Sequence, residues 1–239
     1  LLRRTIVLLE QNVVPGVTTR WLAPLADLIV ASFDESRAAL RGRVEVLGNP
    51  VRRSVVARGR TPLPKDAGLL VFGGSQGAAT INRAMVGALP ELKVLPGLHI
   101  VHQTGAVDHA RTREAYAAAG VTATVEPYLD DMGSAYAAAA LVVARAGATS
   151  VAEITACGRP AILIPYPHAA HGHQERNARA LVAAGAAEMI LDRDLGGGRL
   201  GGAIVALLSN RARLEAMADA SRRAGRPDAA IWRPQSSRS

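Results

Sequence analysis

Short apolar runs alternate with longer segments of helical periodicity along the whole chain. The runs have the length and the continuous apolar character of strands that are buried on both faces of a sheet. Since parallel strands are joined by crossovers that are usually helical, this alternation predicts an α/β fold with a doubly wound parallel sheet. The expected strands are Thr5–Leu9, Leu28–Phe33, Val44–Leu47, Gly68–Phe72, His99–Gln103, Ala123–Tyr128, Leu141–Ala144, Ala161–Ile164 and Glu188–Leu191.

Helical periodicity lies between most of these strands and after the last of them. The expected helices are Thr18–Ala26, Ala78–Leu89, Asp108–Ala119, Met132–Ala139, Ser150–Cys157, His173–Ala184, Leu200–Leu208 and Arg211–Ala224.

A break in this pattern falls between Asn49 and Lys65, where the sequence is rich in arginine, contains proline and has weak periodicity. We interpret this stretch as a connection between two parts of the chain. Residues 1–52 are expected to complete a first sheet and to begin the connection. Residues 53–239 are expected to form a second domain, whose sheet starts at Gly68.

The composition limits the classes of function that the chain can have. No apolar run approaches the roughly 18–20 residues that a membrane-spanning helix needs. The net charge is +8, but the basic residues are scattered, and aromatic side chains, which stack on bases, make up only 3%. We therefore expect no nucleic-acid partner and favour an acidic or phosphorylated one. A single cysteine, Cys157, rules out a disulfide framework within the chain.

Both ends of the sequence carry a signal. The chain starts at Leu1, close to a strand-like apolar run, without an initiator methionine and without the pattern of a signal peptide. We therefore expect a fragment of a longer protein. The tail from Arg226 to Ser239 is polar and interrupted by proline, so we expect it to be frayed.

The sharpest local motif is Gly-Gly-Ser-Gln-Gly at 73–77, between an expected strand and an expected helix. Glycine lets a ligand approach the backbone closely, and the start of a helix offers free N–H groups to a phosphate. The spacing is neither the dinucleotide fingerprint nor the Walker A motif. The alternative is a tight turn in which Ser75 caps the helix.

A second glycine-bearing turn runs from Arg145 into the helix that contains Ser150 and Glu153. It also follows a strand, at the edge of the sheet where ligands bind in open α/β folds. Because Glu153 comes three residues after Ser150, the two could form a capping box. The other interpretation has Glu153 accept hydrogen bonds from sugar hydroxyls.

Three histidines and a glutamate occur within residues 168–175. Their spacing does not match a zinc motif such as HExxH, so we expect no metal but a polar loop, with Gln174 and Asn177 on one helix face. Asp130 and Asp131 could hold Mg²⁺, although such a pair more often caps the next helix. His102, inside an expected strand, is expected to be buried and hydrogen-bonded.

Taken in order, these motifs resemble the MurG family of bacterial glycosyltransferases, over about residues 8–230. The shared motifs are Glu10–Asn12, Gly48–Arg52, Gly73–Gly77, Asp130–Met132, Arg145–Ala148 with Glu153, and His173–Gln174 with Asn177.

The resemblance implies a GT-B fold, in which two Rossmann-like domains enclose the active site. Residues 1–52 would then be the end of the N-terminal acceptor domain with the connection, and residues 53–239 the complete C-terminal UDP-sugar-binding domain. It implies inverting transfer of N-acetylglucosamine from UDP-N-acetylglucosamine to undecaprenyl-pyrophosphoryl-muramoyl-pentapeptide, the step from lipid I to lipid II in peptidoglycan synthesis. The family acts without cofactor or metal, as a peripheral protein on the cytoplasmic face of the bacterial inner membrane.

The resemblance also implies roles for individual residues. Gly74, Ser75 and Gln76 would face the diphosphate, Leu129 would lie against the uracil, and Glu153 would hold the ribose hydroxyls. A phosphate would rest on the helix start formed by Ala148, Thr149, Ser150 and Val151.

The remaining implied contacts come from the last motif and from the first part of the chain. Gln174, with His173, would contact the N-acetylglucosamine, and Asn177 belongs to the same helix. Asn12 and Arg52 would reach the ligand from the first domain and the connection.

One departure is Leu9, where the family has a histidine, and the larger one is that most of the acceptor domain is missing. The general base and the membrane-binding surface lie there in the family, so the catalytic base stays unassigned. We expect this chain alone to bind only the donor. The alternatives are a non-catalytic UDP-sugar-binding subunit that needs a partner chain, or another GT-B enzyme such as a UDP-sugar epimerase.

Overall fold

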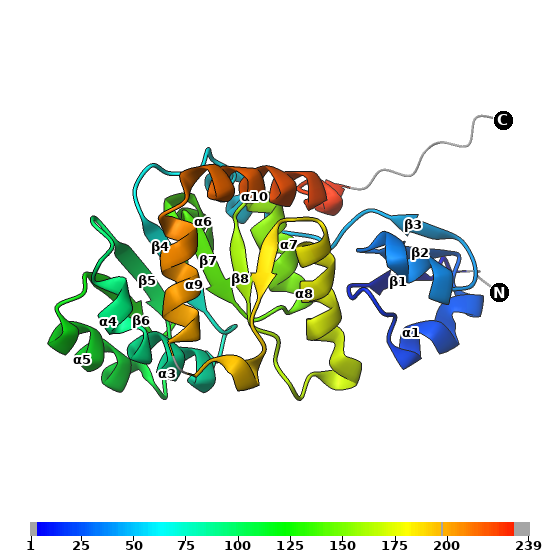
Figure 1. Cartoon of the computed structure of the whole chain (residues 1–239). Helices are drawn as coiled ribbons and strands as arrows, with labels where there is room; N and C mark the ends of the chain where they lie inside the picture. Colours follow the sequence, from blue (N-terminus) through cyan, green and yellow to red (C-terminus); the bar gives the residue numbers. More distant parts are fainter. Residues whose placement is uncertain (1–3, 197, 232–239) are drawn as a thin grey trace.

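The computed structural model describes residues 4–196 and 198–231, which form two parallel sheets (Figure 1). The first sheet has the order β1-β2-β3 and the second the order β6-β5-β4-β7-β8-β9. Every expected strand is present, and its ends lie within two residues of the predicted ones. The bounds are β1 (Val7–Glu10), β2 (Leu28–Ala31), β3 (Val44–Val46), β4 (Gly68–Phe72), β5 (His99–Gln103), β6 (Ala123–Glu126), β7 (Leu141–Ala144), β8 (Ala161–Leu163) and β9 (Ala187–Met189).

Helices cover both faces of the second sheet, which confirms the doubly wound architecture (Figure 1). One face carries α3 (Ala79–Gly87), α4 (Leu89–Leu92), α5 (His109–Ala119), α9 (Arg199–Leu208) and part of α10 (Arg211–Ala224). The other carries α2 (Arg53–Gly59), α6 (Met132–Ala138), α7 (Ala148–Cys157) and α8 (His173–Ala183).

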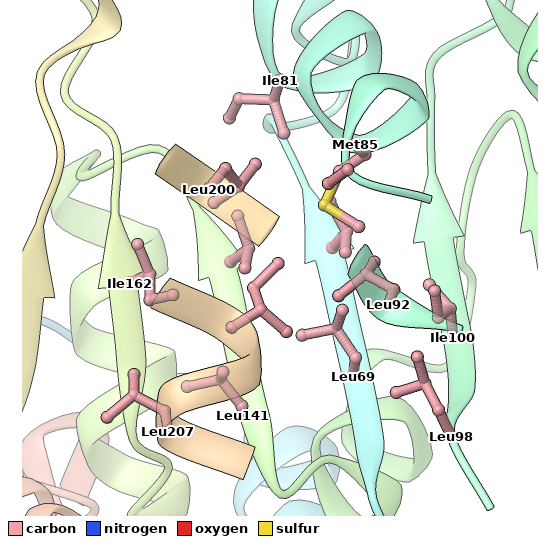
Figure 2. Packing of buried hydrophobic residues seen from close by; sticks show 14 of the residues in the cluster. Leu69, Ile81, Met85, Leu92, Leu98, Ile100, Leu141, Ile162, Leu200 and Leu207 are labelled. Atoms are coloured by element: carbon pink, nitrogen blue, oxygen red, sulfur yellow. The ribbon is translucent and has the colours of Figure 1, made fainter. Parts of the chain in front are cut away.

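Alternate residues of the central strand β4 pack into two separate hydrophobic cores, one on each face of the sheet. Leu69 and Val71 join the core beneath α3 and α9, with Met85 and Leu200 among their neighbours (Figure 2). Leu70 points to the opposite core, beneath α6 and α7. This alternation is the period-two geometry of a strand, and it explains why the buried strands read as uninterrupted apolar runs.

The expected connection between residues 49 and 65 contains a helix that we did not predict, α2. Its buried residues, Val55 and Gly59, lie one turn apart, which is too short a repeat to stand out in the sequence. A Cβ at Gly133 of α6 would lie only 2.9 Å from the Cβ of Arg58, so the absence of a side chain at Gly133 lets α2 and α6 approach closely.

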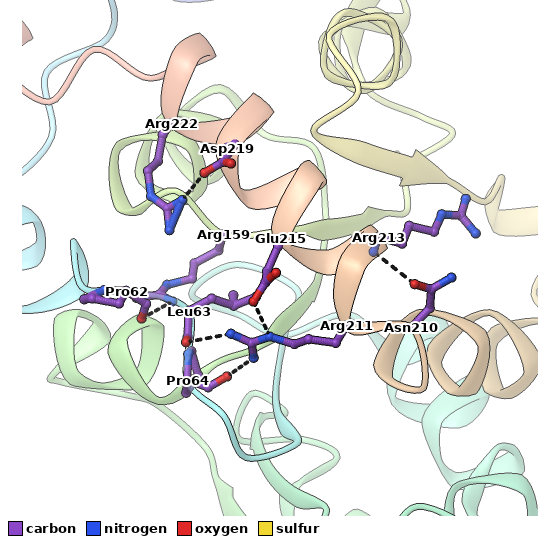
Figure 3. Close-up of polar contacts among 10 residues, drawn as sticks. All are labelled: Pro62, Leu63, Pro64, Arg159, Asn210, Arg211, Arg213, Glu215, Asp219 and Arg222. Carbon is purple, nitrogen blue, oxygen red and sulfur yellow. Dashed lines mark hydrogen bonds and ion pairs between the residues drawn. The ribbon is translucent and has the colours of Figure 1, made fainter.

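Two arginines fix the chain that follows α2 (Figure 3). Arg159 is fully buried and donates to the carbonyls of Gly59, Thr61 and Pro62. Burial lowers the pKa of Arg159 to about 10. Arg211, at the start of α10, donates to the carbonyls of Leu63 and Pro64. These two arginines therefore serve the fold.

The first sheet carries α1 (Val17–Leu22) and the 3₁₀ turns η1 (Ala23–Leu25) and η2 (Asp34–Ala39), with a small core around Ile29. The C-terminal segment returns to this sheet, because the side chain of Arg226 occupies the space beside Gly48. Our expectation of a frayed tail is therefore wrong for residues 226–231. The rest of the tail, residues 232–239, lies outside the described residues.

Candidate functional site

The strand order creates a switch point between β4 and β7. The chain runs from β4 to β5 and β6 on one side and from β7 to β8 and β9 on the other. Phe72 and Ala144, the last residues of β4 and β7, pair directly. In open α/β sheets the ligand crevice lies at the carboxyl ends of the strands at such a point. Both glycine-bearing turns predicted from the sequence start there.

The first turn connects β4 to α3. Gly74 and Gly77 have positive φ angles of 96° and 76°, and Ser75 and Gln76 between them are exposed. Helix α3 begins at Ala79, and no side chain caps it. The capping interpretation of Ser75 is therefore wrong, and the turn presents Ser75 and Gln76 to solvent.

A cavity of about 570 Å³ opens over this turn. Its lining joins four stretches of sequence: residues 73–80 with Arg145, Tyr166 and Gln174. The Oε1 atom of Gln174 accepts a hydrogen bond from the backbone N–H of Tyr166 at 2.9 Å, which fixes the Gln174 amide at the cavity wall. Gly74, Ser75 and Gln76, predicted to face the diphosphate, therefore line the same cavity as Gln174, predicted to contact the sugar.

Arg145 lines this cavity and connects the segments around it. It is almost completely buried, and its Nη1 contacts the carbonyl of Ile164 at 3.1 Å and Oδ1 of Asp192 at 2.5 Å. Its Nη2 donates to Oγ1 of Thr80 at 2.7 Å, and its guanidinium lies over the ring of Tyr166, 5.4 Å from the centroid. A buried, paired arginine of this kind is expensive to disturb.

Sequence reasoning missed the partners of this arginine: Thr80, Tyr166 and Asp192. One signal was present, because an arginine that directly follows a fully buried strand must find partners inside the protein. Nothing in the sequence indicated that these partners come from segments as distant as residues 80 and 192.

The second turn leads from β7 into α7. Helix α7 begins at Ala148 with Gly147 as the N-cap and without a side-chain cap. Ser150 thus lies inside the first turn, and the capping-box interpretation is wrong. Thr149 is exposed and Val151 is buried, so this helix start has one open side.

Glu153 is buried on α7 and has two partners instead of a cap. The hydroxyl of Tyr136 donates to Oε2 at 3.2 Å, and Nη2 of Arg52 lies 3.8 Å from Oε1. Burial raises the pKa of Glu153, while the charge of Arg52 and the hydrogen bond from Tyr136 oppose this shift. Arg52 thus contacts the second domain from the connection, and its contact with the ligand stays a prediction.

Asp131 is the N-cap of α6, which confirms the capping interpretation of the aspartate pair. Its carboxylate accepts from the backbone N–H of Ser134 at 3.1 Å and pairs with Arg58 at 2.5 Å. The hydrogen bonds from Ser134, followed by Arg58, hold its pKa below the ordinary value. Leu129, two residues earlier, is partly buried against the core beneath α6.

Asn177 does not share an environment with Gln174, although both lie on α8. It is fully buried, and its Nδ2 donates to Oδ1 of Asn12 and to the carbonyl of Ala146, both at 3.2 Å. Its Oδ1 accepts from the N–H of Val13 at 3.1 Å. Because the amide atoms of Asn177 are all hydrogen-bonded, its side chain holds Asn12 in position and does not face the cavity.

The remaining predicted residues have simpler environments. His173 is half-buried at the first position of α8. His102 is buried between Asn82 and Tyr116 and hydrogen-bonded to both, as expected. Within residues 4–196 and 198–231, no three His, Cys, Asp or Glu side chains are grouped to hold a metal ion. In the same residues, no helix has both the length and the apolar character needed to cross a membrane.

A doubly wound sheet with a switch-point crevice and two glycine-bearing turns defines a Rossmann-type nucleotide-binding domain. The family model described as the glycosyltransferase family 28 C-terminal domain matches residues 68–231. The chain therefore belongs to glycosyltransferase family 28.

Curated relatives extend the likeness to most of the chain. A protein of Geotalea daltonii is 47% identical over 227 residues, and one of Syntrophotalea carbinolica is 50% identical over 223. Both are named UDP-N-acetylglucosamine--N-acetylmuramyl-(pentapeptide) pyrophosphoryl-undecaprenol N-acetylglucosamine transferase. In each case the match takes in 92% of this chain but only 62% of the relative.

Solved structures confirm the GT-B-type fold. The crystal structure of Acinetobacter baumannii MurG matches with a TM-score of 0.78 and 32% identity, over 95% of this chain and 65% of that one. A putative UDP-N-acetylglucosamine 2-epimerase from Listeria monocytogenes matches with a TM-score of 0.67 at 15% identity, over 95% of this chain and 66% of that one. The second likeness concerns the fold alone.

Proposed function

We propose that this chain binds UDP-N-acetylglucosamine and forms the donor side of an N-acetylglucosaminyltransferase. The acceptor of that enzyme would be undecaprenyl-pyrophosphoryl-muramoyl-pentapeptide, so the reaction converts lipid I to lipid II in peptidoglycan synthesis. One observation carries the proposal: the turn at 73–77 and Gln174, distant in sequence, line one cavity at the switch point. The name shared by relatives at 47% and 50% identity supports the choice of donor and acceptor.

In this proposal the donor spans the switch point. The diphosphate lies along Gly74, Ser75 and Gln76 and near the start of α7, where backbone N–H groups and the helix dipole favour negative charge. The carboxylate of Glu153 accepts hydrogen bonds from the ribose hydroxyls. Gln174 reaches the N-acetylglucosamine from the far wall of the cavity.

The remaining contacts belong to the edges of this site. Leu129 packs on the uracil, and His173 supports the sugar contact. Asn12 and Arg52 link the first sheet and the connection to the ligand, and Asn177 holds Asn12 in place.

The proposed reaction is an inverting displacement at the anomeric carbon. An acceptor hydroxyl forms the new glycosidic bond while the bond from that carbon to the UDP oxygen breaks, so negative charge grows on the diphosphate. Two helix starts and the guanidinium of Arg52 stabilise this charge in place. We assign no residue of this chain as the general base that takes the proton of the hydroxyl.

The chain spans 62% of the relatives' length, so we assign it donor binding alone. In the proposed enzyme, acceptor binding, the general base and contact with the membrane belong to the part of the relatives that this sequence does not match. The proposed location is the cytoplasmic face of the bacterial inner membrane, as a peripheral protein.

Calorimetric titration of the chain with UDP-N-acetylglucosamine, UDP-N-acetylgalactosamine and UDP tests this proposal. We expect saturable binding that prefers the first sugar, and a loss of at least about tenfold in affinity in Glu153→Ala, which removes hydrogen bonds to a charged group. Glu215→Ala is the matched control, because Glu215 is an exposed carboxylate on α10 that pairs only with Arg211 among the ion pairs of the described residues.

The outcomes separate the alternatives. A folded chain that binds none of the three ligands contradicts the proposal. Equal affinity for both sugars favours another GT-B enzyme. Transfer to a lipid acceptor by this chain alone overturns the restriction to donor binding.

A further inference from the structure

The carboxyl end of β5 lies against the glycine-bearing turn that follows β4. Gln103, the last residue of β5, pairs with Phe72, the last residue of β4. Its side chain is only 3% exposed, and its Nε2 donates to the carbonyl oxygen of Gly74 at 2.9 Å. That carbonyl also accepts from the N–H of Gly77 at 2.9 Å, which closes the turn on itself.

The two backbones meet directly at a second place. A Cβ on Gly77 would overlap the carbonyl of Thr104, and a Cβ on Gly105 would overlap the carbonyl of Gln76. Both glycines have positive φ angles, 76° and 77°. Residues 104–105 and 76–77 are therefore packed together without space for side chains between them.

A buried hydrogen-bonded chain fixes residues 102–104 from behind. Nδ2 of Asn82 donates to the carbonyl of Thr104 and to Asp108, both at 2.9 Å, so Oδ1 of Asn82 is the acceptor. Nε2 of His102, 3.1 Å from that Oδ1, must then carry the proton. Nδ1 of His102 is left to accept from the hydroxyl of Tyr116 at 3.0 Å. Each side chain in this hydrogen-bonded network has a defined donor or acceptor role, so residues 102–104 under the turn are held rigidly.

The hydrogen bond from Gln103 determines how one peptide group is turned. A trans peptide is planar, so its C=O and N–H point in opposite directions, and the described chain contains no cis peptide. Because the carbonyl of Gly74 points at Gln103 under the turn, the N–H of Ser75 points away from β5. Ser75 is exposed and lines the cavity, so this N–H faces the cavity side of the turn.

We propose that Gln103 is a positioning residue for the diphosphate of a nucleoside-diphosphate sugar. Its carboxamide holds the peptide between Gly74 and Ser75 in the orientation that offers the N–H of Ser75 to an anion. Gly74 has no heavy atom within 4 Å of the Cβ position, so this peptide is held by the two hydrogen bonds to its carbonyl, from Gln103 and from the N–H of Gly77. The inference rests on the proposed function, because it assumes that the diphosphate binds over this turn.

The test compares Gln103→Glu with Gln103→Met by titration with UDP-N-acetylglucosamine at about pH 5.5 and about pH 8, each relative to wild type at the same pH. A buried carboxyl has a raised pKa, so the new side chain is charged at the higher pH and protonated at the lower one. Charged, it repels the carbonyl of Gly74; protonated, it donates to that carbonyl again. The ligand introduces no titration of its own, since its diphosphate has no terminal phosphate with a pKa of about 6.

We expect Gln103→Glu to bind at least about tenfold more weakly than wild type at the higher pH, and to regain most of that loss at the lower pH. Gln103→Met, which fills the same space without a donor, should stay weak at both. Thermal unfolding of each variant shows that it is folded. If Gln103→Glu fails to fold at the higher pH, Gln103→Met decides: wild-type affinity in that folded variant overturns the inference.

Failure of the inference is distinguishable from failure of the proposed function. If wild type itself binds no UDP-sugar, the proposed function is wrong, whatever the variants do. If wild type binds and both variants keep its affinity, or Gln103→Glu gains nothing at the lower pH, Gln103 does not position the turn.

Discussion

The hydroxyl of Tyr136 donates a hydrogen bond to Oε2 of Glu153 at 3.2 Å, and both side chains are buried. The other carboxylate oxygen lies 3.8 Å from the guanidinium of Arg52, whose side chain is 59% exposed. An ion pair with so exposed a partner stabilises little, so desolvation dominates and the pKa of Glu153 is raised. Burial of this carboxyl therefore costs stability whenever the group is charged, as is common at binding sites.

Glu153→Gln is expected to raise the free energy of unfolding at neutral pH and to weaken UDP-N-acetylglucosamine binding at least about tenfold. A carboxyl whose folded pKa lies above its unfolded value loses stability as pH rises through the folded pKa. Glutamine cannot ionise, so the variant avoids this loss of stability. Its advantage over wild type should disappear at about pH 4, below the ordinary pKa of glutamate. Urea unfolding at both pH values measures the difference in stability between the variant and wild type, with Glu215→Gln as the exposed control. A variant less stable than wild type at pH 7 would contradict the prediction.

Asn177→Ala is expected to destabilise the chain by about 2–4 kcal/mol, because it leaves the partly buried N–H of Val13 and the buried carbonyl of Ala146 without this partner. Asn12→Ala removes only one of the same hydrogen bonds and should cost about 1 kcal/mol. Urea unfolding of the two variants gives the comparison. Equal losses would show that the contact between the first sheet and α8 depends on Asn12 itself.

The strands and both glycine-bearing turns were predictable because each depends on local sequence. A strand buried on both faces must be apolar throughout, and a glycine after such a strand marks a turn at the edge of the sheet. The pairing of β4 with β7, which brings the turns together, follows from the strand order in a doubly wound sheet.

The side-chain partners were not predictable, because they depend on packing between distant segments. The spacing of Ser150 and Glu153 satisfied a capping box, yet Gly147 is the N-cap of α7 and Glu153 accepts from Tyr136 instead. Nothing local distinguishes these two outcomes. The short helix α2 was missed for a related reason: a helix of seven residues with two buried positions carries almost no periodic signal, and α6 stabilises it.

His102 is expected to make the chain lose stability as the pH falls below neutrality. Burial lowers its pKa to about 4 from an ordinary value of about 6.5. A group with a lowered folded pKa contributes stability that is present above pH 6.5 and is lost as the pH falls toward 4; this amounts to about 2 kcal/mol between pH 7 and pH 5. His102→Gln should remove that part of the pH dependence, whereas His99→Gln, at the exposed start of the same strand, should leave it. An unchanged slope in His102→Gln would mean that other groups cause the loss.

Gly77→Ala and Gly74→Ala form a matched pair, because both positions have positive φ but only one is enclosed. A Cβ at Gly77 would overlap the carbonyl of Thr104, whereas a Cβ at Gly74 would meet nothing within 4 Å. Gly74→Ala should cost only backbone strain, about 1–3 kcal/mol. Gly77→Ala must in addition push the turn off the end of β5, so we expect a larger loss of stability and no measurable binding of UDP-N-acetylglucosamine. Urea unfolding and titration of both variants test this, and equal effects would show that conformation alone, without the contact to Thr104, requires glycine in this turn.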